Sequence, residues 1–552
     1  MLASAQLVRT PPPEAFFDQD LGKSAQMATL QQKLKAGDKS ALPAFWKALA
    51  EKGAPIVEPL ADAPHAVLVT FVYRSDKARQ VGLRGLSMAD VPEPLTRLPG
   101  TDVWARTYRI RDDCRISYSF SVEFSPSMVT SRPELPKVST FSLPDPLNHR
   151  RVGPSHSLLV LPNAEAQPLI VVGRDVPAGE VHVHKVASRK LGNDRRVHVY
   201  TPPGYQAGGG PYPLVVLFDG SDYLSGFQGA TILDNLIAQK RLPPTIAVMI
   251  DQVDREGELG LGEKFTDVVA TEIVPWAQQR YHATADPRAT VVGGLSLGGL
   301  AATYAAFRHP EVFGNVLSQS GSYWWYQEGD DEYESLTRQI AAAPRKPIRF
   351  YLEVGLLEVG QAASPTMVVV NRHLRDVLSA KGYHVAFRPF AGGHEPWCWR
   401  GTFGSALADL LAGVRPGKVA SRRPTADLTV QDLGQSLFVP ILRAAALGGG
   451  EAAIQTFREL REKTDRYDID ERVVNVLGYR LLYVYAQPLA AIAVLEDNVK
   501  HFPQSGNVYD SLGEAQYVAG DRARAVQSYK KSLELDPKNT NAVNVLQLLA
   551  QP

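Results

Sequence analysis

The feature that most constrains this chain is a serine set between glycines, where a short apolar strand runs into a helix of small residues. The stretch from Ala289 to Thr303 reads A-T-V-V-G-G-L-S-L-G-G-L-A-A-T, with Ser296 as its serine. This is the strand–turn–helix context of a G-x-S-x-G nucleophile elbow, in which Gly294 and Gly298 leave room for a sharp turn. The pattern also arises by chance in glycine-rich chains, but its flanks favour a true elbow with Ser296 as nucleophile.

Charge and cysteine content limit which ligands, metals and disulfides the chain is expected to have. The 552 residues carry 59 Lys and Arg against 58 Asp and Glu, which gives no support for binding nucleic acid or a membrane surface. The two cysteines, Cys114 and Cys398, are far apart and resemble neither a disulfide framework nor a zinc motif. No apolar run reaches the length of a membrane span. We therefore expect no cofactor, no metal site and no membrane span.

Changes of pattern along the chain predict several domains. Alternating apolar and polar residues after position 66 indicate a β-sandwich, and a later succession of continuous apolar strands and helices indicates a doubly wound, mostly parallel sheet. The predicted parts are an N-terminal extension with short helices (1–54), a β-sandwich (55–165), an α/β-hydrolase domain (176–415), a basic turn-rich linker (416–430) and an entirely helical segment (431–552).

The helical segment carries an internal repeat. Its clearest unit resembles the tetratricopeptide pattern, in which small residues let two helices pack closely and a proline ends the second. Ala491, Leu495 and Pro503 repeat that unit 34 residues upstream of Ala525, Tyr529 and Pro537. We expect about three repeats that dock a protein partner, the alternative being a plain helical bundle.

A serine nucleophile needs a histidine base, and four histidines follow Ser296. His394 lies in a glycine-flanked loop after a strand near the end of the domain, where a hydrolase histidine belongs. His309 precedes a proline at a helix end and His373 lies on a predicted helix, so both are expected to be surface or packing residues; His384 begins a predicted strand.

The acid that orients the base is less clearly marked. Glu358 lies past the end of a predicted strand, where the acid usually sits, and we take it as the third member of the triad. Glu353 lies within that strand and is more typical of a structural carboxylate, while Glu395 is a weaker choice beside the histidine. A Ser–His dyad without a strong acid also stays open.

Oxyanion donors and substrate contacts complete the predicted site. The backbone N–H of Leu297 and that of Gly220 or Ser221, after the strand ending at Phe218, are expected to hold the oxyanion. Four tryptophans fall in two loops expected to rim the site, where they would stack on aryl groups or, alternatively, cap the core. The predicted substrate contacts are Arg255, Trp324, Trp325, Trp397, Trp399 and Arg400.

Over roughly residues 45–415 the chain resembles the enterochelin (enterobactin) esterases, an esterase D-like branch of the α/β-hydrolases. The motifs that carry the resemblance are L-P-G-T-D-V-W (98–104), D-P-L-N (145–148), F-D-G (218–220), I-D (250–251), R-E-G-E-L (255–259), G-L-S-L-G-G (294–299), L-S-Q-S-G-S-Y-W-W (317–325) and G-G-H-E-P-W-C-W-R-G (392–401). Two features depart from the family: Leu295 and Leu297 stand where glutamine and phenylalanine are common, and the simplest members lack the helical tail.

The resemblance implies an immunoglobulin-like N-terminal domain and hydrolysis of the ester bonds of a catecholate trilactone, which releases iron from the ferric siderophore. Ser296 and His394 match the family's catalytic residues, and Arg255 matches a substrate-facing arginine. Iron would arrive with the substrate. A feruloyl- or acetyl-ester hydrolase acting on plant polysaccharide is the nearest alternative, and a scaffold with an inert hydrolase domain is a remote one.

The resemblance also implies a cytoplasmic location. Met1–Gln6 ends in an A-x-A pattern, which fits either the tail of a truncated signal peptide or a disordered end. The first reading would imply a periplasmic or exported protein.

Overall fold

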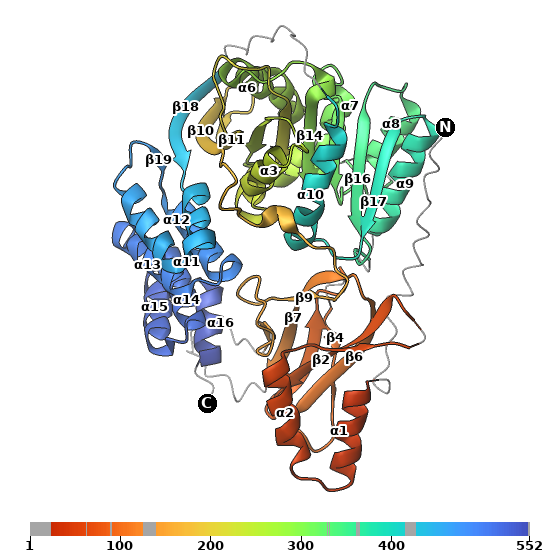
Figure 1. Ribbon diagram of the computed structural model, residues 1–552, viewed down its shortest axis with the longest axis vertical. Coiled ribbons are helices and arrows are strands. Elements are labelled where there is room, and N and C mark those ends of the chain that lie inside the picture. The colour runs from red at the N-terminus through yellow and green to blue at the C-terminus, as the bar shows by residue number, and fades with distance from the viewer. Residues whose placement is uncertain are drawn as a thin grey trace. The chain divides into compact units, whose positions relative to one another are not determined.

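The computed structural model describes residues 24–61, 63–88, 91–124, 140–327, 329–330, 332–359, 365–414 and 427–549 (Figure 1). The N-terminal A-x-A stretch and most of the predicted linker lie outside these residues. The chain divides into two compact units: one comprises Met1–Glu165 with Ala391–Gly393, and the other comprises Ala166–Phe390 with His394–Pro552. The hydrolase domain and the C-terminal helices thus belong to one unit.

The described part of the N-terminal unit contains two helices and two antiparallel sheets. Helix α1 begins after Ser24, whose hydroxyl accepts a hydrogen bond from Met27 N, and this cap satisfies one of the free N–H groups of the first turn. Aromatic residues, including Phe71, Tyr108 and Tyr118, are fully buried. The elements are α1 (Ala25–Lys35) and α2 (Ala41–Lys52); one sheet in the order β1 (Ile56–Pro59), β2 (Ala66–Arg74), β6 (Val103–Arg111), β5 (Thr96–Arg97); and a second in the order β4 (Glu93–Pro94), β3 (Ala78–Arg84), β7 (Arg115–Phe124), β8 (Thr140–Leu143), with β9 (Ser157–Val160) also on β7.

A ten-stranded sheet forms the centre of the second unit. Six neighbouring strands are parallel, in the order β17 (His384–Phe390), β16 (Arg349–Gly355), β15 (Asn315–Gln319), β14 (Thr290–Leu295), β12 (Leu214–Phe218), β13 (Ile246–Ile250). Antiparallel β11 (Asn193–Thr201) and β10 (Glu180–Ser188) extend it beyond β13. Because β12 and β13 are buried on both faces, their residues form continuous apolar runs, as expected, whereas β17 at the edge is half-exposed or exposed.

Helices cover both faces of this sheet (Figure 1). Along β12, Val215 and Leu217 belong to one buried apolar cluster, while Leu214, Val216 and Phe218 belong to the other. Among the helices of the hydrolase domain, those that contribute to the first cluster are α3 (Gly229–Ala238) and α10 (Pro396–Leu410). Those that contribute to the second are α4 (Arg255–Leu259), α5 (Glu263–Val268), α6 (Val274–Tyr281), α7 (Leu297–Arg308), α8 (Ser335–Ala342) and α9 (Met367–Ala380).

The prediction that the chain from residue 431 is entirely helical was wrong. Strand β18 (Leu428–Ser436) pairs antiparallel with β10, from Ser188 opposite Leu428 to His182 opposite Gln435, and short β19 (Tyr467–Asp468) pairs with β18. The strand was missed because its residues are mostly half-exposed or exposed and lack an apolar run.

The C-terminal helices share their core with the hydrolase domain. Leu477 and Leu481 belong to the same continuous buried cluster as Leu236 and Phe403 of the hydrolase helices. Arg196 of β11 also forms ion pairs with Asp468 and Asp470. The helices are α11 (Phe438–Arg461), broken at Gly449, then α12 (Glu471–Tyr479), a π-helical turn (Arg480–Val484), α13 (Pro488–His501), α14 (Gly506–Val518), α15 (Arg522–Leu535) and α16 (Thr540–Leu549).

The shared core can be tested with Leu477→Ala. Truncating this fully buried side chain is expected to lower the free energy of unfolding by about 2–5 kcal/mol. All seven tryptophans lie before residue 400, so tryptophan fluorescence reports on the rest of the chain and not on these helices. We expect the fluorescence-detected melting temperature to fall. Leu489→Ala, at a side chain 73% exposed, is the control; an unchanged fluorescence transition in Leu477→Ala would contradict a shared core.

Asp234 provides a test of pH dependence. Burial raises the pKa of this α3 carboxyl to about 6, opposed by hydrogen bonds from Tyr200 Oη (2.7 Å) and Gly179 N (2.8 Å). Because this folded-state pKa lies above the unfolded value, the group's favourable contribution is present below pH 4 and is lost as pH rises through 6. Asp234→Asn keeps an acceptor oxygen and should gain up to about 3 kcal/mol over the wild type above pH 6, with the gain shrinking toward pH 4. Urea unfolding at several pH values measures this gain, and a difference independent of pH would refute it.

Candidate active site

The backbone at Ser296 has the conformation expected of a nucleophile elbow. Ser296 lies between β14 and α7 with φ 57° and ψ −121°, a strained conformation for a residue with a side chain. A Cβ atom on Gly294 would lie 2.4 Å from the carbonyl carbon of Gly298, and one on Gly299 would lie 2.7 Å from Ser318 Oγ. Glycine at 294 and 299 therefore permits the close approach of strand, helix and neighbouring strand that the turn requires.

The end of β15 and the turn that follows it are hydrogen-bonded to the elbow. Ser296 N donates to Gln319 O (2.9 Å), and Ser322 N donates to Ser296 O (3.0 Å). The Oγ atoms of Ser296 and Ser322 are 3.3 Å apart. These contacts fix where the serine hydroxyl stands relative to residues 319–322.

His394 and Glu358 form a hydrogen-bonded pair. His394 Nδ1 lies 2.8 Å from Glu358 Oε2. The other oxygen, Oε1, accepts hydrogen bonds from Ser320 Oγ (2.5 Å) and Gly355 N (2.8 Å), and the carboxylate is fully buried. Since the carboxylate accepts a hydrogen bond from Nδ1–H, the ring keeps its proton on Nδ1 and Nε2 is the basic nitrogen. The pair thus has the arrangement of the base and the orienting acid in a serine hydrolase.

The two alternative carboxylates, Glu353 and Glu395, contact groups other than His394. Glu353 Oε1 accepts hydrogen bonds from Gln319 Nε2 and Thr402 Oγ1. This carboxylate therefore belongs to a buried hydrogen-bond network near the carboxyl ends of β15 and β16. Glu395 precedes the first residue of α10, and its Oε1 lies 3.7 Å from Cys398 Sγ.

The other histidines are placed elsewhere. His309 pairs with Asp267, and His373 pairs with Glu334. His384 is exposed at the start of β17.

Ser296 Oγ and the His394 ring share no hydrogen bond among the residues that the structure describes. In structures without substrate, such catalytic contacts are often long and tighten only when substrate is bound. The elbow and the His–Glu pair are nevertheless linked through one turn, because Ser320 binds Glu358 and Ser322 binds Ser296.

Hydrogen bonds within the protein show which backbone N–H groups after β12 are already engaged and so cannot serve as oxyanion donors. Ser221 N donates to Asp251 Oδ1 (2.7 Å), and Asp219 N donates to Gln252 Oε1 (3.1 Å), so neither N–H is available to a substrate oxygen here. Because the Ser221 N–H is engaged with Asp251, Gly220 is the remaining alternative after β12. Leu297 is the first residue of α7, where the N–H groups have no partner within the helix.

Arg255 lies beside Asp219, the residue that follows β12, and the first tryptophan pair (Trp324 and Trp325) lies near Gly260. The Arg255 guanidinium forms two hydrogen bonds with the Asp219 carboxylate, both 2.8 Å, and Asp219 would lie 3.1 Å from a Cβ atom on Gly298 of the elbow. Trp325 packs against Gly260, next to the helix α4 (Arg255–Leu259). Trp324 and Trp325 are partly buried, with ring centroids 5.6 Å apart.

The second tryptophan pair differs from expectation. Trp397, Trp399 and Arg400 lie in the first turns of helix α10 and not in a loop. Trp399 is 2% exposed, donates from Nε1 to Ser320 Oγ (2.8 Å) and contacts the His394 ring edge to face at 4.7 Å. Trp399 therefore packs behind the histidine and is not a substrate contact.

Arg400 is also engaged within the protein. Its Nε donates to Gln167 Oε1 (2.8 Å), and the guanidinium lies over the Trp397 ring at 5.0 Å. With 9% exposure it is better suited to holding the start of α10 than to binding an anionic ligand.

Comparison with known proteins agrees with this geometry. Residues 188–410 match the family model described as "Putative esterase", and residues 68–170 match "Enterochelin esterase, N-terminal". The iron(III) enterobactin esterase of Dickeya dadantii is 30% identical over 444 residues, covering 72% of this chain and 98% of that protein. The chain belongs to the enterochelin esterase family.

Two further enterobactin esterases, one compared by sequence and one by structure, are also similar to this chain. The iron(III) enterobactin esterase of Escherichia coli K12 is 33% identical over 340 residues, which cover 58% of this chain and 82% of that protein. The crystal structure of the Shigella flexneri enterobactin esterase in the presence of enterobactin is 28% identical with a TM-score of 0.52, covering 67% of this chain and 97% of that one. This chain is thus a carboxylic ester hydrolase with additional residues beyond the shared domains.

Two contributors to the site were not predicted from the sequence. Ser320 connects Glu358 and Trp399, and Asp251 binds both the N–H and the hydroxyl of Ser221. Both lie in motifs shared with the family, S-Q-S-G-S and I-D, which give no role for the individual residue. Among the residues described, no group of histidine, cysteine and carboxylate side chains is arranged to hold a metal ion.

Glu358→Gln tests the acid. The substitution removes the negative charge that holds His394 and stabilises its protonated form, so kcat for a p-nitrophenyl ester should fall on the order of 10⁴-fold. Glu353→Gln is the matched control, five residues away in the same strand–loop segment, and should retain most of the turnover. A larger loss in Glu353→Gln than in Glu358→Gln would assign the acid to position 353.

Proposed function

We propose that this chain is a serine esterase that hydrolyses the ester bonds of a ferric catecholate siderophore and so releases its iron. The observation that carries the proposal is the His394–Glu358 pair, tied through residues 320–322 to the elbow of Ser296, in a member of the enterochelin esterase family. Support for the substrate comes from the relatives named as iron(III) enterobactin esterases and from the structure solved in the presence of enterobactin.

In the proposed mechanism Ser296 Oγ attacks the ester carbonyl while His394 Nε2 takes its proton. Glu358 holds Nδ1 and stabilises the imidazolium that forms. The N–H groups of Leu297 and Gly220 donate to the developing oxyanion. The imidazolium then protonates the departing alcohol, and water, deprotonated by His394, hydrolyses the acyl-enzyme.

Substrate recognition is proposed for the side with Arg255 and the first tryptophan pair. A ferric tris-catecholate complex is anionic and presents flat aryl rings. The Arg255 side chain is 41% exposed although paired with Asp219, and so offers a cation. Trp324 and Trp325, with Trp397 at the start of α10, offer aromatic faces for stacking. Iron enters as part of the substrate.

Two details of the fold are also proposals. The N-terminal sheets have the strand order expected of an immunoglobulin-like sandwich, in which strands A, B, E, D form one sheet and C, F, G the other. The helices α13 and α15 begin at Pro488 and Arg522, and α14 and α16 begin at Gly506 and Thr540, so equivalent helices recur every 34 residues. This spacing supports tetratricopeptide-like repeats.

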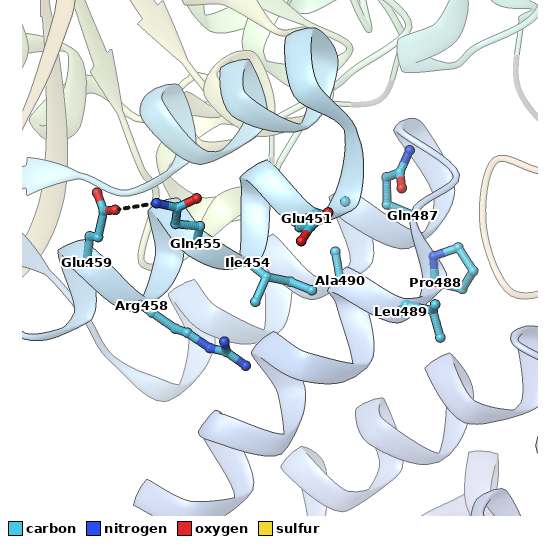
Figure 2. Close-up of a pocket in the computed structure, with 10 residues that line it drawn as sticks. Glu451, Ile454, Gln455, Arg458, Glu459, Gln487, Pro488, Leu489 and Ala490 are labelled. Atoms are coloured by element: carbon cyan, nitrogen blue, oxygen red, sulfur yellow. Dashed lines mark hydrogen bonds between the residues drawn. The ribbon is translucent and has the colours of Figure 1, made fainter.

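A protein partner for these repeats stays a prediction. Its candidate site is a groove of about 770 Å³ between the second half of α11 and the start of α13 (Figure 2). Ile454 and Leu489 give it apolar surface, and Glu451, Arg458 and Glu459 lie around it.

The cytoplasmic location also stays a proposal, based on family membership. Within the described ranges, no helix combines the length and apolar character that crossing a membrane requires.

The substrate proposal is tested by comparing turnover of ferric enterobactin with that of methyl ferulate. We expect a much higher kcat/KM for the siderophore; the reverse order would favour a feruloyl esterase. Ser296→Ala should lower the turnover of every ester by about 10⁴–10⁶-fold. Ser379→Ala, at an exposed serine of α9, is the control. Equal, measurable turnover in Ser296→Ala and wild type would refute the nucleophile, whereas no turnover in either protein would favour an inert hydrolase domain.

A further inference from the structure

The loop Asp219–Gln228, which joins β12 to α3, holds an unusual backbone. Asp219 (φ 54°) and Gln228 (φ 59°) are both left-handed without being glycine, and a π-helical turn spans Asp222–Gly226 between them. Such conformations persist only where the surroundings hold them in place. Gly220, the proposed oxyanion donor, lies in this loop against β13, where a Cβ atom would be 2.5 Å from the carbonyl carbon of Met249.

Residues of the hydrolase domain hold the first half of the loop. Arg255 binds the Asp219 carboxylate, and Asp251 accepts hydrogen bonds from Ser221 N and Ser221 Oγ, both 2.7 Å. Tyr223, which is fully buried, donates to Gln319 Oε1 (2.8 Å).

The C-terminal helices hold the second half. Arg480 Nη2 donates to Ser225 Oγ (3.3 Å), which in turn donates to Ser221 O (2.7 Å) next to the first half of the loop. Gln228 Nε2 donates to Tyr485 Oη (2.7 Å), at the strained residue that ends the loop. The segment from Arg480 to Tyr485 therefore contacts the loop at two points.

Charge at this contact also favours a fixed arrangement. Burial and the nearby Asp219 raise the pKa of Asp222, while Arg480 and Arg255 act in the opposite direction. The Nε atom of Arg480 is buried and has no hydrogen-bond partner in the described part of the chain. Placing a guanidinium here has a desolvation cost, which lowers the pKa of Arg480 although the charge of Asp222 acts in the opposite direction. The hydrogen bond to Ser225 and the attraction to Asp222 offset only part of this cost.

We infer that Arg480 and Tyr485 are positioning residues for the oxyanion side of the esterase site, acting through the loop Asp219–Gln228. The inference rests on the proposed function, because Gly220 of this loop is the proposed donor. It gives the C-terminal helices a role in catalysis beyond partner docking. These helices lie beyond residue 410, where the esterase match ends, and the Dickeya dadantii relative is covered over 98% of its length by only 72% of this chain.

Tyr485→Phe and Arg480→Met in the full chain test this inference. Losing an oxyanion donor outright typically lowers kcat 10²–10³-fold, so a shifted donor should lower it about 10-fold. KM for a p-nitrophenyl ester should stay the same. The Kd of a boronic-acid transition-state analogue should rise by about the same factor by which kcat falls. Arg480→Lys, which keeps the charge, should recover part of the loss.

Tyr483→Phe is the matched control, because it removes a tyrosine hydroxyl that donates to Glu514 within the helices. We expect its kcat to stay near that of the wild type. All rates are measured well below each variant's melting temperature.

Three results would overturn the inference: unchanged kcat in Tyr485→Phe and Arg480→Met, an equal loss of kcat in Tyr483→Phe, or analogue binding that stays constant while kcat falls. Ser296→Ala measured in parallel separates the two proposals. If it abolishes turnover while the helix variants remain fully active, the inference fails and the proposed function stands. If Ser296→Ala remains active, the proposed function itself fails.

Discussion

The close approach of β14 and α7 at Gly294 and Gly298 is the constraint on which the rest of the site depends. It holds Ser296 at φ 57°, with the residue's own N–H bonded to Gln319 at the end of β15 and its carbonyl bonded to Ser322 in the segment that follows. That segment then holds Glu358 through the Ser320 hydroxyl, and Glu358 holds His394. A disturbance at the glycines would therefore reach the base as well as the nucleophile, because each group is placed by the one before it.

A site residue could be predicted from the sequence only where its own sequence neighbours mark its role. Ser296 and His394 are marked by their own glycine-rich neighbours. The choice between Glu353 and Glu358 is not local, since both lie near the end of one strand. It is decided by partners from elsewhere: Gln319 and Thr402 bind the first carboxylate, while Ser320 and His394 bind the second.

The tryptophans illustrate the same limit. Trp397 and Trp399 appear equivalent if residues 396–400 form a loop. On the helix that they actually form, two positions are separated by about 200° around the axis. One ring therefore pairs with Arg400 while the other packs behind His394. The strand β18 was unpredictable for a related reason: its partner β10 lies more than two hundred residues earlier, and its half-exposed residues carry no apolar pattern.

The position of β18 also determines which strand forms the open edge of the sheet. An unpaired strand at the edge of a sheet presents a row of backbone donors and acceptors that another chain can recruit. Here the chain supplies its own neighbour for β10, from Ser188 to His182. A polypeptide shortened to end at Val414 would retain every residue of the proposed triad, yet it would display the bare edge of β10 and with it a template for intermolecular sheet growth. The C-terminal segment thus moves the open edge of the sheet from β10 to β18, whose register against β10 shifts between Val183 and His184 and whose end is covered by β19, both features that make an edge a poorer template.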